Sequence, residues 1–246
     1  GREDLYYGYT ADNVATPINE NEYMLSYLDK FETEGIEVLT IDYCSTENYM
    51  LNSYTSNNSK GYISFAADQR NLNNIPDYPA DLYNISSDDI DDLSQAKNFL
   101  YLINSENFIL PQGFIDTVKL TNYDVIIMDL FHNEESYTSS QINELKSKDN
   151  GGNRLVICYM SIGEAEDYRF YWKNSWNTEN PIWLDRENPD WAGNYKVRYW
   201  EQSWQDIIFG NDNSYLKKIL DAGFDGVYLD IIDGFDYFEN YHSFLR

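Results

Sequence analysis

The sequence contains little cysteine and little histidine. The two cysteines, Cys44 and Cys158, each lie inside an apolar run, where a small buried hydrophobic residue is typical. Two isolated thiols provide neither a disulfide framework nor a set of metal ligands, and His132 and His242 are too few for a zinc site. Neither a metal nor a cofactor is therefore expected.

Basic residues are also scarce. The chain has 17 lysines and arginines against 42 acidic residues, which gives a formal net charge of -25. A charge of this sign repels phosphate backbones and anionic lipid surfaces, so neither a nucleic acid nor a membrane is an expected partner. The same field attracts a polycation.

Long apolar runs are missing as well. No run approaches the roughly 20 apolar residues of a membrane span, so no such span is expected. The sequence starts with Gly1 and continues at once with Arg2, Glu3 and Asp4. No signal peptide is visible in this pattern, so secretion cannot be inferred directly from it.

Aromatic residues, by contrast, are abundant, with 23 Tyr, 12 Phe and 6 Trp. The tryptophans all fall in one segment that is interleaved with Asn, Pro and Gly: Trp172, Trp176, Trp183, Trp191, Trp200 and Trp204. Indole rings in such a segment are typical of a sugar-binding cleft, because the C–H face of a pyranose packs on them. A small core beneath a long loop is the alternative for part of this set.

The pattern of apolar runs predicts an α/β protein. Six short runs rich in Val, Ile, Leu and Tyr occupy residues 38–43, 62–67, 99–103, 125–129, 155–161 and 227–232. Because they lack strict alternation, they are typical of strands buried on both faces of a parallel sheet. Amphipathic stretches with helical spacing lie between them, and a length of 246 residues suits a single barrel domain over 1–246, with two small domains as the alternative.

Two segments between these runs also carry signals. The stretch 68–92 is rich in Asn, Asp, Pro and Ser and has no periodicity, so it is expected to be a long loop. Gly223 follows the amphipathic stretch 204–222 and predicts a left-handed helix cap.

Polar residues at strand ends are the candidates for chemistry. Asp230 lies towards the C-terminal end of the apolar run 227–232, and a carboxylate there is costly unless it has a function. A structural Asp that caps the next helix is the alternative, and Asp233 fits it better. The segment 159–169 is another strand end dense in ionisable groups, where we expect Arg169 to pair with a nearby glutamate as scaffolding.

Three separated motifs resemble one known family. They are GEAEDYRFYW (163–172), ENPDWAGNYKVRYW (187–200) and FDGVYLDIIDGFDYFE (224–239). In this order and spacing they resemble glycoside hydrolase family 114, the endo-α-1,4-polygalactosaminidases and their bacterial relatives. NFLYLIN (98–104) and YDVIIMDLF (123–131) resemble the first two strands of that family. The resemblance implies a (β/α)8 TIM barrel.

The N-terminal portion resembles the same family out of order. The segments that resemble its closing strands are REDLYYGY (2–9), IEVLTIDYC (36–44) and GYISFAADQRNL (61–72). Residues 1–80 are therefore expected to correspond to the end of a typical member and residues 97–246 to its beginning, in circularly permuted order. One further βα unit of the family would fall after Arg246 and before Gly1, so the barrel is expected to be incomplete or to be completed from elsewhere.

The resemblance also implies a pair of catalytic carboxylates. Glycoside hydrolysis needs one carboxyl group to protonate the leaving oxygen and another to attack the sugar or activate water. Carried over by motif, these are Asp230, as the nucleophile, and Glu3, as the general acid/base. Neighbouring strand ends supply the residues that we assign to substrate binding: Tyr159, Glu164, Asp129, Asp42, Tyr43 and Asp233.

The implied substrate is a galactosamine-containing α-1,4-linked polysaccharide, which is cationic where it is deacetylated. An acidic chain suits such a polymer. Because the polymer is extracellular, the protein is expected outside the cell or at the cell surface, and its oligomeric state is left open. A non-catalytic carbohydrate-binding or surface protein that retains the barrel is the alternative function. A relative of aminoacyl-tRNA synthetases is disfavoured by the charge and by the lack of phosphate-binding glycine motifs.

Overall fold

The computed structural model describes residues 1–243 of the chain, with side chains described as far as Glu239. The chain forms two compact units. The first comprises Gly1–Met128 and Ser140–Ile157, and the second comprises Asp129–Ser139 and Cys158–Arg246. The boundary falls inside strand β8 (Leu155–Ser161), and the prediction of one barrel domain over 1–246 stays a prediction.

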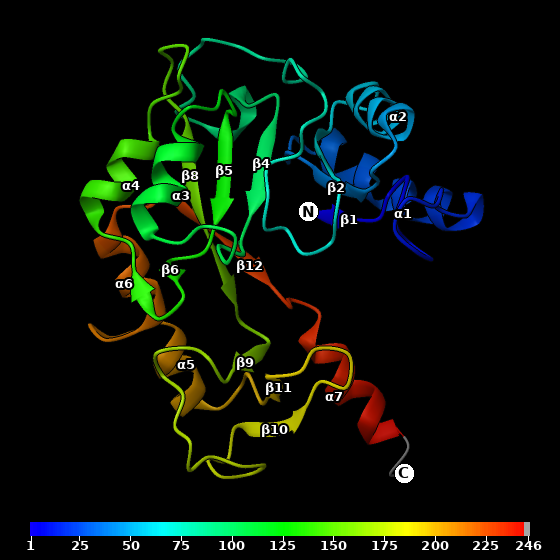
Figure 1. Ribbon diagram of the computed structural model, residues 1–246. Helices are drawn as coiled ribbons and strands as arrows, with labels where there is room; N and C mark the ends of the chain where they lie inside the picture. The colour runs from blue at the N-terminus through cyan, green and yellow to red at the C-terminus, as the bar shows by residue number, and fades with distance from the viewer. Residues whose placement is uncertain (244–246) are drawn as a thin grey trace. The chain divides into compact units, whose positions relative to one another are not determined.

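The first unit contains a parallel three-stranded sheet with the order β1-β2-β3 (Figure 1). The elements of this part are β1 (Arg2–Glu3), α1 (Ile18–Thr33), β2 (Leu39–Tyr43), α2 (Glu47–Asn58) and β3 (Ile63–Ala67). Helix α1 packs Met24 and Leu28 against a cluster that contains Leu5, Val38 and Tyr62. Helix α1 thus packs on its own sheet through apolar side chains, as expected for an α/β layer.

A second sheet has the order β12-β8-β5-β4. Its elements and the neighbouring helices are η1 (Leu93–Gln95), β4 (Phe99–Leu102), α3 (Pro111–Val118), β5 (Val125–Met128), α4 (Ser139–Leu145), β8 and β12 (Gly226–Asp230). Strands β4 and β5 pair in parallel, and all of their residues are buried. All six predicted strands are confirmed as strands, and the fold is α/β with parallel sheets. The expected burial on both faces is wrong for β12, whose residues are partly buried or exposed. Within residues 1–243 the strands are distributed over separate sheets, and a closed, permuted barrel stays a prediction.

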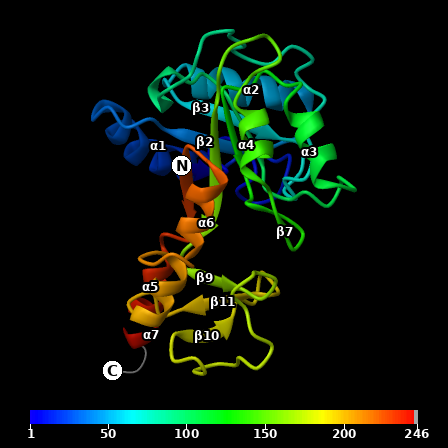
Figure 2. The ribbon, with the colours of Figure 1, turned by 90° about the vertical axis from the view of Figure 1, so that its left-hand side faces the viewer.

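The remaining elements belong to the second unit. They are β6 (Phe131–His132), β7 (Glu135–Ser136), β9 (Glu164–Glu166), β10 (Leu184–Glu187), β11 (Asn194–Val197), α5 (Gln202–Ile208), α6 (Tyr215–Ala222) and α7 (Gly234–Ser243). Strands β9, β10 and β11 form an antiparallel sheet of order β10-β11-β9, with α5 beside it (Figure 2). Gly223 adopts a left-handed conformation with φ 87° at the end of α6, which confirms the predicted cap.

Helical spacing identified helix α1 but not the face that it buries. Tyr23, Tyr27, Leu28 and Phe31 keep the expected helical spacing, but of these only Leu28 is buried. The buried face carries Met24 and Leu28, which follow Tyr23 and Tyr27 by one position. Two adjacent stripes of this helix are apolar, and spacing alone does not say which of them meets the sheet.

The tryptophan-rich segment forms a small core in the second unit. Trp183 and Trp204 are fully buried, with ring centroids 4.8 Å apart, and Trp176 meets Trp183 edge-on at 5.0 Å. Trp191 and Trp200 remain exposed. The alternative of a core beneath a long loop is therefore confirmed for part of the set, while the exposed rings stay candidates for sugar stacking.

A buried ion pair anchors the long polar loop of the first unit. The Lys148 ammonium donates to the carbonyl oxygens of Ser86 and Asp88 at 2.8 and 2.7 Å and to Asp124 Oδ1 at 2.8 Å. Both charged side chains have no exposed surface. Asp124 Oδ2 also accepts from the Lys97 backbone amide at 2.9 Å. The predicted loop 68–92 is confirmed, and this ammonium holds its C-terminal part against the chain that enters β5.

Replacing Lys148 with Met is expected to lower the free energy of unfolding by about 3–5 kcal/mol, because it leaves the Asp124 carboxylate buried without its counter-ion. Urea unfolding followed by circular dichroism measures the change. The matched control is Lys97→Met, which removes an exposed ammonium that pairs with Asp88 at 3.6 Å and is expected to cost no more than about 0.5 kcal/mol. Equal losses in the two variants would contradict this account.

Candidate functional site

Asp230 is the last residue of β12 and carries a half-buried carboxylate. The Tyr159 hydroxyl, from β8, donates to its Oδ2 at 2.7 Å. The backbone of the same residue is fixed too, since the Ile162 amide donates to the Asp230 carbonyl at 3.1 Å. Among the described residues, no hydrogen bond reaches Oδ1, so one carboxylate oxygen is held while the other stays available.

The backbone turns sharply directly after Asp230. Ile231 has φ 55°, a left-handed conformation that is unfavourable for a β-branched side chain. Gly163 lies against this turn, because a Cβ atom on it would come within 2.2 Å of the Ile231 carbonyl oxygen. A Cβ on Gly234 would lie 3.3 Å from the Gly163 Cα. The close contact of these backbones keeps the strand end that bears Asp230 in one conformation.

A buried ionic cluster lies in the same unit. Arg169 donates from Nη1 to Asp129 Oδ1 at 2.8 Å and from Nε to Glu166 Oε2 at 2.6 Å, and its Nη2 lies 2.7 Å from Asp129 Oδ2. Burial lowers the pKa of Arg169, but the two carboxylates outweigh this effect and raise that pKa well above its ordinary value. The expected pairing of Arg169 with a glutamate is confirmed for Glu166, which also accepts from the Tyr168 hydroxyl at 2.6 Å.

Glu164 begins strand β9 and is almost fully buried. Its Oε1 accepts hydrogen bonds from the Lys196 ammonium and, at 2.9 Å, from Asn188 Nδ2. Lys196 stands opposite Glu164 in the pairing of β9 with β11. The carboxylate is thus neutralised by its cross-strand neighbour, and its assignment to substrate binding stays a prediction. The position of Lys196 could have been found only from the strand register, which the sequence does not specify.

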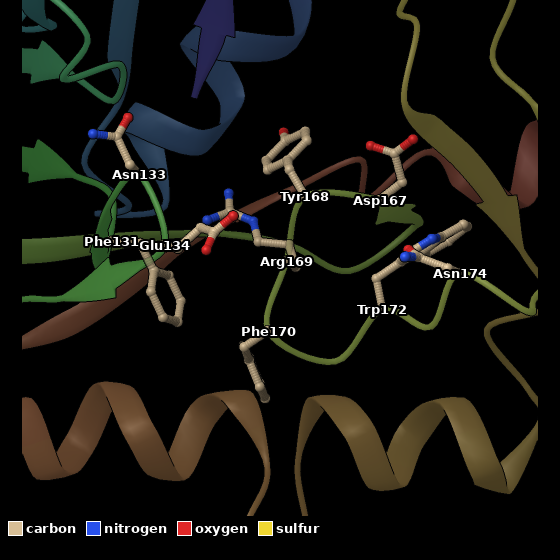
Figure 3. A pocket seen from close by; sticks show the side chains of 9 residues that line it. All are labelled: Phe131, Asn133, Glu134, Asp167, Tyr168, Arg169, Phe170, Trp172 and Asn174. Atoms are coloured by element: carbon tan, nitrogen blue, oxygen red, sulfur yellow. The ribbon is translucent and has the colours of Figure 1, made fainter.

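A pocket of about 340 Å³ opens in the second unit (Figure 3). It is lined by Phe131, Asn133, Glu134, Asp167, Tyr168, Arg169, Phe170, Trp172 and Asn174. Its volume falls at the lower end of the range for small-molecule sites. The sequence pointed to this region through the density of charges and rings in 163–172, but not to the contribution from residues 131–134.

The first unit holds the other predicted residues. Asp42 is fully buried, and its two oxygens accept from the Tyr6 and Tyr7 amides, Ser53 Oγ and Asn57 Nδ2. Burial raises the pKa of this carboxyl group, and the four donors oppose that rise. Donors from the chain itself therefore bind both carboxylate oxygens of Asp42. Its assignment to substrate binding stays a prediction.

Glu3 and Tyr43 lie next to Arg70, a residue that no sequence motif indicates. The Arg70 guanidinium stacks 3.8 Å from the centroid of the buried Tyr43 ring, and its Nη1 is 4.0 Å from Glu3 Oε2. Burial is the main cause that raises the pKa of the Tyr43 hydroxyl, and the nearby Glu3 carboxylate raises that pKa further. Asp4, directly after Glu3, has φ 61°, so Glu3 and Asp230 are each followed by a residue in the left-handed region. Glu3 is partly exposed at the end of β1, and its pairing with Asp230 stays a prediction.

The remaining expectations concern Asp233, a metal site, a membrane span, and the cysteines and histidines. Asp233 is exposed and directly precedes α7, which fits the helix-start alternative. Within the described residues there is no group of three or more His, Cys, Asp or Glu that could hold a metal ion, and no helix is long and apolar enough to cross a membrane. Cys44 and Cys158 are buried and free. His132 is buried, and the side chain of His242 lies outside the described residues.

Comparison with known proteins decides the family. The model of glycoside-hydrolase family GH114 matches residues 94–244, which is more than half of the chain. The chain belongs to family GH114. The match contains all three motifs on which the resemblance rested, together with Asp230, Tyr159 and the pocket. Residues 1–93 lie outside it, so the permuted order of the N-terminal portion stays a prediction.

Similar segments occur in proteins of archaea and bacteria that are named only as uncharacterized. A protein of Methanocaldococcus jannaschii is 44% identical over 131 residues, which are 52% of this chain and 36% of that protein. Proteins of Thermotoga maritima and Deinococcus radiodurans are 38% and 35% identical over 134 and 129 residues, or 54% and 52% of this chain and 40% and 39% of theirs. The aligned segment thus spans less than half the length of each of these relatives.

Replacing Gly163 with Ala is expected to destabilise the second unit by about 1–3 kcal/mol, because the new methyl group collides with the Ile231 carbonyl. Differential scanning calorimetry measures the shift in melting temperature. Gly113→Ala is the matched control, since nothing lies within 4 Å of the added Cβ in α3, and it should leave stability unchanged or raise it by up to about 1 kcal/mol. A Gly163→Ala protein as stable as the control would contradict the close contact.

Proposed function

We propose that this protein is a glycoside hydrolase that cleaves α-1,4-linked galactosamine-containing polysaccharide with Asp230 and Glu3 as its two catalytic carboxylates. The observation that carries the proposal is membership of family GH114 over residues 94–244, a range that includes the strand ending in Asp230. The aligned segment covers only 36% of the Methanocaldococcus jannaschii relative. The activity is therefore proposed for this chain and is not taken from a whole relative.

Asp230 has the environment that a nucleophile needs. A carboxylate that attacks the anomeric carbon requires one free oxygen and a fixed direction of approach. The Tyr159 hydroxyl holds Oδ2 at 2.7 Å and leaves Oδ1 available among the described residues. The strained turn at Ile231, packed on Gly163, fixes the backbone next to the carboxylate. These features support Asp230 as the group that attacks the sugar or orients the attacking water.

The acid/base role is proposed for Glu3 on the resemblance of the EDLYY-like segment to the family's glutamate-bearing strand. Glu3 is partly exposed, which leaves its carboxyl group able to exchange protons with water. Protonation of the glycosidic oxygen by such a group assists departure of the leaving sugar, and the same group then takes a proton from water. The permuted barrel is part of this proposal, since Glu3 lies in the N-terminal portion.

The substrate is proposed to be cationic. A formal net charge of -25 raises the local concentration of a positively charged polymer around the protein. Galactosamine polymers carry positive charge wherever the amine is free, and their extracellular location implies that the protein acts outside the cell or at its surface. The exposed rings of Trp191 and Trp200 supply faces on which a sugar can stack.

Asp230→Asn is expected to lower kcat for release of reducing ends from purified galactosaminogalactan by about a thousandfold or more, because the amide is no nucleophile. Asp221→Asn, which removes an exposed carboxylate on α6, is the matched control and should retain activity. Polymer binding is measured in parallel. Binding without hydrolysis in the unsubstituted protein would favour the alternative, a non-catalytic carbohydrate-binding protein.

Glu3→Gln is expected to slow hydrolysis of the polymer by about 10²–10⁴-fold, because the leaving sugar then departs without a proton. An aryl galactosaminide with a good leaving group should be affected far less in its first step. Glu47→Gln removes an exposed carboxylate of the same unit and serves as the control. If Glu3→Gln slowed both substrates equally, or neither, the acid role of Glu3 would be refuted.

A further inference from the structure

The pocket of about 340 Å³ in the second unit has aromatic walls but no free cation. Phe131, Tyr168, Phe170 and Trp172 contribute rings, and Tyr168 and Phe170 expose large parts of theirs. Phe131 and Phe170 stack with centroids 5.8 Å apart, so the two rings support each other. A hollow of this size, lined by aromatic rings together with polar side chains, fits a single sugar residue.

Arg169 is the only cation among the lining residues, and its N–H groups are already bound to carboxylates of the chain. Its Nε, Nη1 and Nη2 groups contact Asp129 and Glu166, and only 5% of its side chain is exposed. A phosphate or a uronate entering the pocket would have to displace one of these carboxylates from a buried ion pair, which is strongly unfavourable. The guanidinium therefore supports the pocket floor and does not recruit an anion.

Two lining carboxylates remain without a counter-ion. Within the described residues, no ion pair or hydrogen bond neutralises the side chain of Glu134 or Asp167, and both residues are exposed. The Lys218 ammonium lies 4.9 Å from the Phe170 centroid, so it contacts that ring without lining the pocket. The excess of carboxylates over cations makes the pocket attractive to a positively charged guest.

Figure 3 shows Asp167, Trp172 and Asn174 together at one end of the pocket, with Phe131 at the other. A six-membered sugar that stacks on an indole presents its substituents at the edge of the ring, where a carboxylate and an amide can reach them. The Asp167 carboxylate can pair with an ammonium group, and the Asn174 amide can form a hydrogen bond with a hydroxyl group. Stacking and the Asn174 contact serve any sugar, so the Asp167 carboxylate is the group at this end of the pocket that distinguishes an amino sugar from a neutral one.

We infer that this pocket is a sugar subsite in which Asp167 selects a residue with a free, protonated amine while Trp172 stacks on the ring. The inference rests on the proposed carbohydrate function and adds a specificity-determining residue to it. An N-acetylated residue keeps the stacking contact but loses the ion pair. Asp167 thus sets the preference between the two forms of the polymer and takes no part in bond cleavage.

Binding is tested in the Asp230→Asn protein, so that hydrolysis does not interfere. The probes are a de-N-acetylated α-1,4-galactosamine oligosaccharide and its N-acetylated counterpart, each titrated by calorimetry. Adding Asp167→Asn is expected to weaken binding of the free amine about three- to fivefold, as for an exposed ion pair, and to change binding of the acetylated form less than twofold. Trp172→Phe is expected to weaken both probes alike.

Asp190→Asn is the matched control, because it removes an exposed carboxylate of the same unit that does not line the pocket. It should change binding of either probe less than twofold. Equal losses from Asp167→Asn and Asp190→Asn, or equal losses for the two probes in Asp167→Asn, would overturn the inference and assign any preference to the overall charge.

The unsubstituted protein is assayed on both polymers to separate this inference from the proposed function. If it hydrolyses the polymer while Asp167→Asn behaves like the control, the inference fails and the hydrolase assignment stands. If it hydrolyses neither polymer but binds the free amine through Asp167, the hydrolase assignment fails and the subsite stands.

Discussion

The pairing of Arg169 with Asp129 and Glu166 is the interaction on which the second unit's pocket depends. Asp129 follows β5, Glu166 ends β9 and Arg169 lies in the loop after it. One planar guanidinium with several donors can hold two carboxylates at fixed angles, which a lysine could not do. It also places Tyr168, whose ring lies 5.1 Å from the guanidinium carbon. Without this cation, two carboxylates would be buried together, and the loop carrying the aromatic wall would lose its support.

The carboxylates of this acidic protein differ in whether their oxygens can bind a ligand. Asp42, Asp124 and Glu164 are buried and bound by donors from the chain itself, so a substrate would have to compete with those donors. Asp230 keeps an oxygen available, and Asp167 faces solvent without a counter-ion among the described residues. Net charge alone does not distinguish these groups. The hydrogen-bond partners of each oxygen do, and they separate residues that hold the fold together from residues that can meet a ligand.

Sequence reasoning succeeded where the signal was local. The six strands were recognisable because each lies in a nearly continuous apolar run, although β12 is only partly buried, and Asp230 stood out because it interrupts such a run. It failed where the outcome depended on contacts between distant residues. Arg70 reaches Asp12, 58 residues away, and the Lys148 ammonium reaches the Ser86 carbonyl, 62 residues away. Neither contact follows a periodic pattern, so the sequence offered no sign that these cations would organise the loops around them.

The left-handed conformation of Ile231 shows how the carboxylate beside it is maintained. The left-handed conformation is unfavourable for an isoleucine, so contacts with the surrounding atoms must stabilise it. The contact of Gly163 with the Ile231 carbonyl is one part of that constraint. The geometry of Asp230 is therefore a property of the assembled unit, which a short peptide of the same sequence would not reproduce. Loosening the packing around Gly163 would release the isoleucine to an extended conformation and turn the carboxylate away, even with every side chain of the site unchanged.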